Sequence, residues 1–359
     1  MSLLFHLLRV RAVVPETAEA CVVSFEPADG EAALWRFEPG QHLTLRAMVG
    51  GQELRRSYSL CAAPGEGLRV GVRRVAGGAF SSWLHEHLKP GDLIEAMPPQ
   101  GAFGRALALA PRHVLAVAGG SGITPMLSIL RAHLAAAPTN RATLVYANRT
   151  AASTMFAAEL DDLKNRHLAR LAVFPVFSRE QVDAPLAAGR LDGERLATIV
   201  RLVGGGAAVG QAFVCGPHAM NDEVEAALRS AGVDPARIHV ERFGVPPAEP
   251  ATAAEPRPGD AELARTTARI TLVRDGLTRE FGYIAADGNL LDAAARTGLD
   301  VPYSCKSGVC ATCRAKLVEG QVRMARNFAL EPGDIAAGFV LTCQAHPLTE
   351  RVVISFDER

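Results

Sequence analysis

Residues 302–313 read PYSCKSGVCATC, and a further cysteine, Cys343, follows after 29 intervening residues. The first three cysteines are Cys305, Cys310 and Cys313, separated by four and then by two residues. This spacing is typical of plant-type [2Fe–2S] clusters, which are held by cysteine thiolates. The intervening residues are mostly small, so backbone N–H groups can approach the cluster sulfurs. Because a four-cysteine zinc site usually pairs two short knuckles and Cys343 stands alone, the four cysteines predict a [2Fe–2S] cluster.

The sequence around these cysteines predicts a small α+β domain over residues 266–359. Strand-like runs at 268–274 and 277–283 suit a hairpin, NLLDAAARTG suits a helix, and short strands follow the cysteine motif. The region carries eleven Lys and Arg and eleven Asp and Glu, so its net charge is zero. A free electron carrier relies on net charge for long-range steering, whereas a tethered domain meets its partner at high effective concentration. The charge balance therefore favours a tethered domain.

A tether precedes this domain. Residues 246–262 read PPAEPATAAEPRPGDAE, with five prolines, five alanines and no large apolar residue. Such a composition cannot bury a core, and proline stiffens the chain into a spacer. We predict that residues 246–265 form a linker between the C-terminal domain and the rest of the chain.

Two more domains are predicted before the linker. Residues 1–105 contain short β-type runs separated by Gly and Pro turns, with one helical insert, FSSWLHEHL, after a glycine pair. This pattern indicates an antiparallel β-barrel. Residues 106–245 instead alternate apolar strands with amphipathic helices, which predicts a parallel sheet with helices on both faces. The predicted fold is therefore multidomain, with a β-barrel domain, an α/β domain and an α+β domain of the β-grasp type.

In the run ELRRSYSL at residues 53–60, strand alternation places Arg56 and Tyr58 on one side and Ser59 on the other. A flavin needs a cation for its phosphate, an aromatic face for its ring and a hydrogen-bond partner near its redox-active nitrogen. The run could supply all three, although an exposed strand with Arg and Tyr is an equally simple interpretation. The sequence GGAFS at residues 77–81 favours the flavin, because free N–H groups at the start of the following helix can bind pyrophosphate.

A buried-strand run, Val114–Ala118, leads into GGSGITP at residues 119–125. Thr124 suits the N-cap of the next helix, and Pro125 suits its first turn. A glycine-rich turn between strand and helix can cradle the phosphates of a dinucleotide, although Pro125 stands where a G-x-G-x-x-G motif would have its third glycine. The turn predicts a nucleotide site.

Two arginines follow the next two predicted strands. The strand ATLVYA leads to Asn148-Arg149-Thr150, and LAVFPVF leads to Ser178 and Arg179. An NAD-specific site would place an acidic residue here for the ribose hydroxyls, whereas guanidinium groups suit a 2′-phosphate. These positions predict NADPH over NADH, with solvated surface arginines as the alternative.

Cys215-Gly216-Pro217 follows the strand AFV and precedes a helix. Ligands bind at the carboxyl ends of strands in open α/β sheets, so Cys215 is a candidate for the nicotinamide pocket. A buried cysteine that acts as a small hydrophobe is the competing interpretation. Cys21 and Cys61 are interpreted as structural.

Composition argues against several other classes. Lys plus Arg and Asp plus Glu are balanced at 38 each, which gives no support for a nucleic-acid partner or an anionic membrane surface. The most apolar stretch, around residues 113–122, is short and ends in glycines, so it cannot span a bilayer. The first residues lack the features of a signal peptide, and four of the seven cysteines lie in the last sixty residues, which fits a metal site better than a disulfide scaffold. We expect a cytoplasmic protein that binds neither nucleic acid nor membrane.

With these motifs in order, the chain resembles the ferredoxin–NADP reductase superfamily over essentially its whole length, and within it the reductase subunits of phenylacetyl-CoA epoxidases. The motifs that carry the resemblance are RRSYSL, GGAFSSWL, GGSGITPMLSIL, YANRT, SRE, CGP and ERFG. The resemblance implies FAD contacts from Arg56, Tyr58, Ser59, Gly78 and Ser81. It implies nucleotide contacts from Gly120, Gly122, Thr124, Cys215 and Gly216, and 2′-phosphate recognition by Arg149, Ser178 and Arg179. It also implies a catalytic set of Tyr58, Ser59, Cys215, Glu241 and Phe243, the last two as a pair that closes over the flavin.

The implied function is electron transfer from NAD(P)H through a flavin and a [2Fe–2S] cluster to a separate oxygenase. NAD(P)H gives two electrons as hydride and the cluster takes one at a time, so a flavin must stand between them. FAD is favoured over FMN, and the resemblance favours a multi-subunit di-iron oxygenase, the phenylacetyl-CoA epoxidase of phenylacetate catabolism. The alternatives are the reductase of another aromatic-ring dioxygenase or monooxygenase and, more remotely, an iron–sulfur redox sensor. No basic patch or DNA-binding motif in the sequence supports the sensor.

Overall fold

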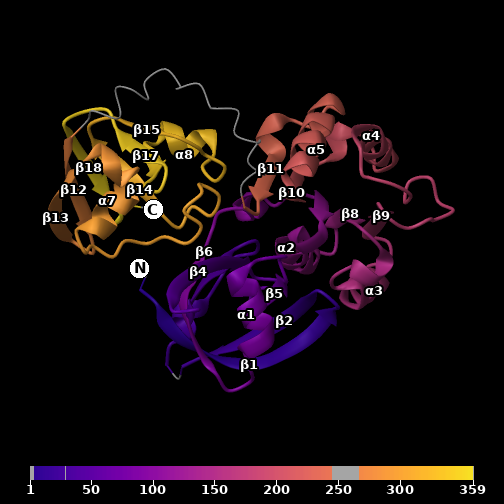
Figure 1. Cartoon of the computed structure of the whole chain (residues 1–359). Coiled ribbons are helices and arrows are strands. Elements are labelled where there is room, and N and C mark those ends of the chain that lie inside the picture. The colour runs from indigo at the N-terminus through magenta and orange to yellow at the C-terminus, as the bar shows by residue number, and fades with distance from the viewer. Residues whose placement is uncertain (1–3, 29, 245–266, 359) are drawn as a thin grey trace. The chain divides into compact units, whose positions relative to one another are not determined.

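The computed structural model of the chain describes residues 4–28, 30–244 and 267–358. Residues Phe5–Phe243 form one compact unit, and the C-terminal residues belong to a second (Figure 1). The predicted linker at residues 246–265 lies outside the described residues. No helix in the described part of the chain is long and apolar enough to cross a membrane.

The N-terminal half of the first unit is a six-stranded sheet of antiparallel neighbours, as predicted. Its strands are β1 (His6–Thr17), β2 (Ala20–Pro27), β3 (His42–Val49), β4 (Gln52–Ser59), β5 (Leu68–Arg73) and β6 (Leu93–Gln100). They follow the order β4-β3-β6-β1-β2-β5, and a bridge between Leu60 and Val70 joins the two edge strands. This bridge closes the sheet into a barrel. Phe80 and Leu84 of helix α1 (Ala79–His87) pack into the apolar core of the barrel.

The second half of this unit is the predicted parallel sheet. Its strands β7 (His113–Gly119), β8 (Arg141–Asn148), β9 (Leu171–Phe177), β10 (Gln211–Gly216) and β11 (Ile238–Arg242) lie in the order β11-β10-β7-β8-β9. Its helices are α2 (Ile123–Ala136), α3 (Ala157–Arg166), α4 (Gly193–Leu202) and α5 (His218–Ser230). Residues of α2 and α3 share one apolar core with the sheet, and residues of α4 and α5 share another (Figure 1). Helices therefore cover both faces, as the alternating apolar pattern predicts.

Helix α4 is absent from the predicted elements. Its buried residues are Leu196, Ile199 and Val200, and polar residues occupy most of its other positions. Asp192 caps the helix by accepting a hydrogen bond from the backbone N–H of Arg195 at 2.8 Å. Leu196, Ile199 and Val200 follow the i, i+3, i+4 spacing of one helix face, and packing of this face in the tertiary structure stabilises the short helix.

The C-terminal unit has a mixed five-stranded sheet in the order β13-β12-β18-β14-β16. Its elements are β12 (Ala268–Arg274), β13 (Leu277–Tyr283), α7 (Leu290–Arg296), β14 (Arg314–Glu319), β15 (Val322–Met324), α8 (Pro332–Ala336), β16 (Phe339–Leu341), β17 (Ala345–Pro347) and β18 (Arg351–Ser355). The predicted hairpin is present as β12 and β13, and β12 pairs in parallel with β18. Leu290 and Leu291 of α7 share the apolar core with Cys313 and Cys343. The core of this unit therefore reaches two of the predicted cluster ligands.

An ion-pair network joins the barrel to the helices of the parallel sheet. Glu159 on α3 accepts hydrogen bonds from Arg69 on β5 at 2.5 Å and from Arg131 on α2 at 3.1 Å. Arg131 also lies 2.9 Å from Glu66, in the loop before β5. The two arginine side chains are 25% and 18% exposed, so salt screens these pairs less than it screens pairs on the open surface. The network helps to fix how the barrel and the parallel sheet face each other.

Candidate flavin, nucleotide and cluster sites

The three predicted flavin residues lie at the end of β4, and their burial follows the strand alternation predicted from the sequence. Arg56 is exposed, Tyr58 is half-buried and Ser59 is buried. The Tyr58 ring lies 6.1 Å from that of Phe80 on α1, in a tilted arrangement. Burial raises the pKa of the Tyr58 hydroxyl, so the hydroxyl stays protonated and can donate a hydrogen bond. The strand thus offers a cation, a partly open aromatic face and hydroxyl groups, which are the groups that a flavin requires.

The loop before α1 leaves the first N–H groups of that helix without a side-chain cap. Gly78 occupies the N-cap position. The Ser81 hydroxyl accepts a hydrogen bond from the backbone N–H of Val75 at 3.1 Å and donates to the Gly78 carbonyl oxygen at 3.3 Å. A Cβ on Gly78 would come within 2.8 Å of the Ser81 oxygen. The glycine therefore allows a close turn whose N–H groups fit the pyrophosphate of FAD.

Ser59, Cys215 and Glu241 meet although they come from distant parts of the chain. Glu241 on β11 lies opposite Cys215 on β10 in the parallel register, and its carboxyl group is hydrogen-bonded to the Ser59 side chain. Glu241 is half-buried as a residue, but its Oε2 is shielded from solvent and has no hydrogen-bond partner among the described residues. A buried oxygen without a partner is a group that a bound cofactor can satisfy. This cluster of three side chains therefore fits the edge of a flavin or nicotinamide ring.

Burial also sets the protonation of this cluster. Desolvation raises the pKa of Glu241 to about 8, against an opposing contribution from the hydrogen bond to Ser59. Burial, with the nearby Glu241 carboxyl as a second cause, raises the pKa of the Cys215 thiol. Near pH 7 both groups are therefore neutral and carry their protons, so each can donate a hydrogen bond.

Phe243 is the aromatic residue of the pair that is expected to close over the flavin. It follows β11, and 40% of its surface is exposed. Its expected role of closing over the flavin stays a prediction.

The turn after β7 is tighter than the sequence suggests. Gly120–Gly122 form a 3₁₀ turn, the N-cap of α2 is Gly122, and the helix begins at Ile123. The expectation that Thr124 is the N-cap is wrong, because the chain is already helical before it. Thr124 is buried in the first turn of α2, and its hydroxyl donates to the carbonyl oxygen of Ser121 at 3.0 Å. Thr124 therefore fixes the shape of the turn from inside.

Two glycines let this turn lie against the end of β10. A Cβ on Gly122 would stand 2.0 Å from the carbonyl oxygen of Cys215, and a Cβ on Gly216 would stand 3.1 Å from the Cα of Gly119. Neither position has room for a side chain. The close approach brings the predicted phosphate turn and Cys215 into one site.

Replacing Gly122 by alanine is expected to lower the free energy of unfolding by about 1–3 kcal/mol, because the added methyl group overpacks the contact with β10. Chemical denaturation of the purified protein measures this difference. Gly282→Ala on β13 is the matched control, since a Cβ there meets nothing within 4 Å. Equal losses of stability in the two variants would contradict the close approach of the turn to Cys215.

Arg73, at the end of β5, is a candidate site residue that sequence reasoning missed. Its Nη1 lies 3.1 Å from the position that a Cβ on Gly120 would take. A guanidinium this close to a glycine-rich turn suits a phosphate bound by that turn. The sequence does show two arginines, Arg73 and Arg74, at the end of a predicted strand. It does not show that this strand lies beside Gly120 in the fold.

The predicted 2′-phosphate residues lie at neighbouring strand ends. The backbone N–H of Arg179 donates to the carbonyl oxygen of Arg149 at 2.8 Å, and that of Ser178 donates to the carbonyl oxygen of Asn148 at 2.9 Å. Arg149 makes an ion pair with Glu19 at 3.9 Å, and both side chains are more than half exposed. Such a pair contributes little, so the Arg149 guanidinium can turn towards a ligand.

The four cysteines of the C-terminal unit come together. The neighbouring thiols of Cys310 and Cys343 lower the pKa of the Cys305 thiol, and that of Cys343 lowers the pKa of the Cys313 thiol. In the described part of the chain no group of three or more His, Cys, Asp or Glu side chains surrounds the position of a single metal ion. A [2Fe–2S] cluster instead divides four thiolates between two irons. Contacts between Cys305 and Cys310 and between Cys313 and Cys343 fit that division.

The backbone of the cysteine loop has an uncommon shape. Lys306 and Ala311 both have φ of +52°, and Gly308 has φ of +80°. Positive φ is uncommon for residues other than glycine and persists where the surroundings hold the chain in that conformation. The backbone N–H of Ser307 points to Sγ of Cys305 at 3.3 Å. The loop therefore wraps with N–H groups facing sulfur, which fits a cluster of iron and sulfide.

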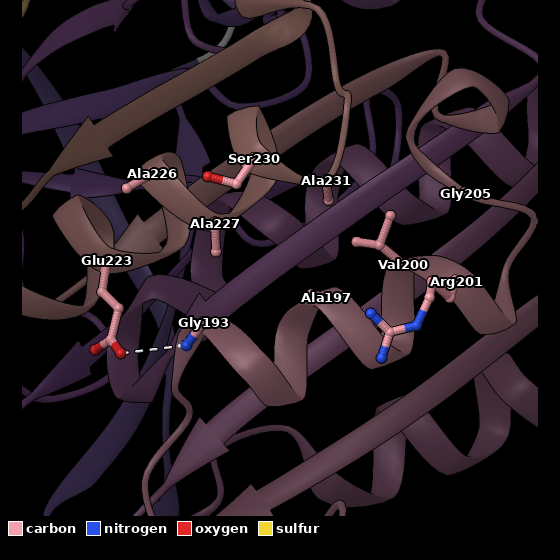
Figure 2. A pocket seen from close by; sticks show the side chains of 10 residues that line it. All are labelled: Gly193, Ala197, Val200, Arg201, Gly205, Glu223, Ala226, Ala227, Ser230 and Ala231. Atoms are coloured by element: carbon pink, nitrogen blue, oxygen red, sulfur yellow. Dashed lines mark hydrogen bonds between the residues drawn. The ribbon is translucent and has the colours of Figure 1, made fainter.

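A cavity of about 580 Å³ lies apart from these sites, between α4 and α5 (Figure 2). Small residues such as Ala197 and Ala227 line most of it, and Glu223 at its edge accepts a hydrogen bond from the backbone N–H of Gly193 at 3.2 Å. None of the predicted site residues lines this cavity.

Three family models match the chain. Residues 18–104 match the oxidoreductase FAD-binding domain, residues 116–226 the oxidoreductase NAD-binding domain, and residues 275–348 the 2Fe-2S iron-sulfur cluster binding domain. Together with the geometry above, these matches define an electron-transfer oxidoreductase with FAD, NAD-binding and 2Fe–2S domains.

Curated relatives match the chain over nearly all of its length. One subunit of the 1,2-phenylacetyl-CoA epoxidase from Escherichia coli (strain K12) is 43% identical over 358 residues, which cover 99% of this chain and 98% of that protein. The ferredoxin reductase component of 3-ketosteroid-9-alpha-monooxygenase from Rhodococcus rhodochrous is 34% identical over 98% of this chain and 96% of its own length. The chain belongs to the family of oxygenase reductase components that includes this 1,2-phenylacetyl-CoA epoxidase subunit.

Solved structures show the same fold. The structure of phthalate dioxygenase reductase aligns with a TM-score of 0.59 at 24% identity and covers 98% of both chains.

Proposed function

We propose that the chain passes electrons from NADPH through FAD and a [2Fe–2S] cluster to a separate oxygenase, the phenylacetyl-CoA epoxidase of phenylacetate catabolism. The observation that carries the proposal is the meeting of Ser59, Cys215 and Glu241, which joins the barrel to the nucleotide half of the first unit. The 43% identity to the Escherichia coli 1,2-phenylacetyl-CoA epoxidase subunit supports the choice of oxygenase, and with it a multi-subunit di-iron partner. The 34% identity to a 3-ketosteroid-9-alpha-monooxygenase component supports a second candidate, another oxygenase.

The barrel would hold FAD, which is favoured over FMN. Arg56 and the start of α1, with Gly78 and Ser81, would bind its phosphates, and Tyr58 would cover one face of its ring. Ser59 would contact the ring edge. Bound FAD supplies the chemistry that turns a two-electron hydride donor into a source of single electrons for the cluster.

The residues of the chain orient the ring and control protons around it. Glu241 keeps its carboxyl group protonated near pH 7, and its unpartnered Oε2 would meet the bound ring system. Cys215, fully buried beside it, excludes water from the nicotinamide side of the site. The work of these groups is orientation and electrostatic tuning rather than acid–base turnover of the substrate.

Nucleotide binding would use the turn after β7. Gly120 and Gly122 bring backbone N–H groups to the phosphates, with Arg73 as the nearby cation. Thr124 holds the turn, and Cys215 and Gly216 border the nicotinamide. At the neighbouring strand ends, Arg149, Ser178 and Arg179 would recognise the 2′-phosphate.

Replacing Arg149 and Arg179 together by alanine is expected to raise the KM for NADPH about tenfold or more, because two charge-assisted phosphate contacts are lost. The KM for NADH should change little. Steady-state rates with ferricyanide measure both constants. Arg166→Ala, which removes an exposed arginine near the end of α3, is the control. Equal use of NADPH and NADH by the wild-type protein would defeat the 2′-phosphate assignment.

The domain organisation and the cellular compartment of the chain are also proposals. We propose domain limits of 1–105, 106–245 and 266–359, with the linker at 246–265 between the last two. The mixed sheet and helix α7 of the C-terminal unit support a β-grasp ferredoxin domain. All seven cysteines are free, which supports a reducing compartment, the cytoplasm.

The function as a whole is tested by reconstitution. Purified holoprotein with NADPH is expected to support epoxidation of phenylacetyl-CoA by the purified oxygenase component of phenylacetyl-CoA epoxidase. The measurement is the amount of epoxide formed. Omission of either protein is the control. Reduction of cytochrome c without any product from this oxygenase would retain the electron-transfer chain and reject phenylacetyl-CoA epoxidase as the partner.

A further inference from the structure

Phe156 has a backbone conformation that is rare for an aromatic residue. It precedes α3 with φ of +59° and ψ of 27°, in the left-handed region, and only 1% of its surface is exposed. Bulky residues with positive φ are outliers that the surrounding structure must hold in place. The contacts that hold Phe156 therefore indicate what the strained residue does.

Two strands of the barrel hold it. Glu16 on β1 accepts a hydrogen bond from the backbone N–H of Phe156 through Oε1 at 2.5 Å. The ring of Phe156 rests against Gly71 on β5, where an added Cβ would stand 2.9 Å from Cζ of the ring. Phe156, a residue of the nucleotide half, thus contacts the barrel both through its backbone and through its side chain.

Contacts next to Phe156 also extend to the glycine-rich turn at Gly120. The buried hydroxyl of Tyr146 lies 3.1 Å from the carbonyl oxygen of Gly120 and 3.2 Å from that of Met155, the residue before Phe156. Gly120 is also the residue that faces the Arg73 guanidinium of the barrel. One run of contacts therefore links Glu16 through Phe156 and Tyr146 to the turn.

We propose that Glu16 and Phe156 form a latch that sets the position of the Gly120 turn relative to the barrel, and that both are positioning residues for nucleotide binding. The inference rests on the proposed binding of the nucleotide at this turn. With the latch closed, Gly120 and Arg73 stay close enough to bind one phosphate from two sides. With the latch lost, the turn can move away from Arg73, while the flavin residues of β4 are unaffected.

The test is calorimetric titration of NADP+ into the oxidised, FAD-loaded full-length protein. Glu16→Ala removes the acceptor, and the Kd is expected to rise about tenfold because the phosphate donors are no longer aligned. Glu16→Gln keeps an acceptor oxygen and should return the Kd to within about threefold of the wild-type value. Glu26→Ala, which removes an exposed carboxylate on β2, is the matched control. The KM for NADPH should rise with Glu16→Ala while kcat with ferricyanide changes little.

Two further variants keep the proposal testable if Glu16→Ala folds poorly. Phe156→Asn removes the ring but suits the left-handed backbone, and it should also weaken NADP+ binding. Tyr146→Phe removes the hydroxyl that links Met155 to Gly120. If the run of contacts carries the effect, the losses of NADP+ affinity in Tyr146→Phe and Phe156→Asn will be less than additive when the two changes are combined. Thermal melting shows which variants are folded.

Different outcomes of these titrations would reject the latch and the proposed nucleotide site. Wild-type affinity for NADP+ in folded Glu16→Ala and Phe156→Asn proteins would overturn the latch and leave the proposed function intact. Full additivity with Tyr146→Phe would also overturn it. A wild-type protein that binds neither NADP+ nor NAD+ would reject the proposed nucleotide site, and the latch with it.

Discussion

Serine in place of Cys310 is expected to lower NADPH-driven reduction of cytochrome c by on the order of 100-fold, because the cluster loses a thiolate ligand. A serine hydroxyl has a much higher pKa than a thiol, so it is a poorer ligand for iron at neutral pH. Iron and sulfide content and the electron paramagnetic resonance spectrum of the reduced protein should report the same loss. Stopped-flow reduction of the flavin by NADPH should stay near the wild-type rate, because residues Phe5–Phe243 form a compact unit of their own.

Cys61→Ser is the matched control for this substitution. Cys61 is a buried cysteine of the barrel whose Sγ donates to the carbonyl oxygen of Arg69 at 3.4 Å, and a serine hydroxyl can make the same bond. That variant should keep both cofactors and both rates. A Cys310→Ser protein that retains two irons and the wild-type rate of cytochrome c reduction would refute the ligand assignment.

Glutamine in place of Glu241 is expected to remove a pH dependence from the rate of flavin reduction. Burial raises the pKa of Glu241 to about 8, so the wild-type rate should fall as pH rises through that value and the carboxyl group loses the proton it donates. Glutamine keeps a hydrogen-bonding group but cannot lose a proton. Glu241→Ala, which removes the group altogether, should slow flavin reduction by about 100-fold, because the site loses a preorganised hydrogen-bond donor to the ring system. Stopped-flow traces between about pH 6 and pH 9.5, a range that brackets the raised pKa, measure both effects.

The same carboxyl group links folding to pH. Its pKa is raised in the folded protein above the ordinary value of 4.5, so the folded state holds a proton that the unfolded chain releases. The stabilisation is complete below about pH 4.5 and is lost as pH rises through about 8. Glu241→Gln should remove this part of the slope in the free energy of unfolding, whereas the exposed Glu194→Gln should not.

Ser59 provides a second check on this assignment. Its hydrogen bond lowers the pKa of Glu241 and so opposes the effect of burial. Ser59→Ala should therefore move the pH midpoint of flavin reduction above the wild-type value. A midpoint that is unchanged in Ser59→Ala and in Glu241→Gln would show that another group titrates.

The predictions that succeed from sequence rest on local patterns. Alternation of apolar strands with amphipathic helices predicted the parallel sheet, and short runs between turns predicted the antiparallel one, because both patterns report how one segment repeats along itself. Helix α4 was missed although Leu196, Ile199 and Val200 follow the spacing of one helix face, because the helix is short and lies between glycine-containing segments. Thr124 was misplaced because the 3₁₀ turn at Gly120–Gly122 extends the helix backwards.

By itself the sequence determined the cysteine spacing, the glycine-rich turn after a buried strand and the order of the three larger sheets along the chain, since each depends on residues close together in the chain. The tertiary structure alone placed Arg73 beside Gly120, Glu16 beside Phe156 and the Ser59 side chain against Glu241. These contacts join the barrel to the parallel sheet, and no local repeat records how two sheets pack together. Their geometry follows from burying both cores at once, which only the folded chain can do.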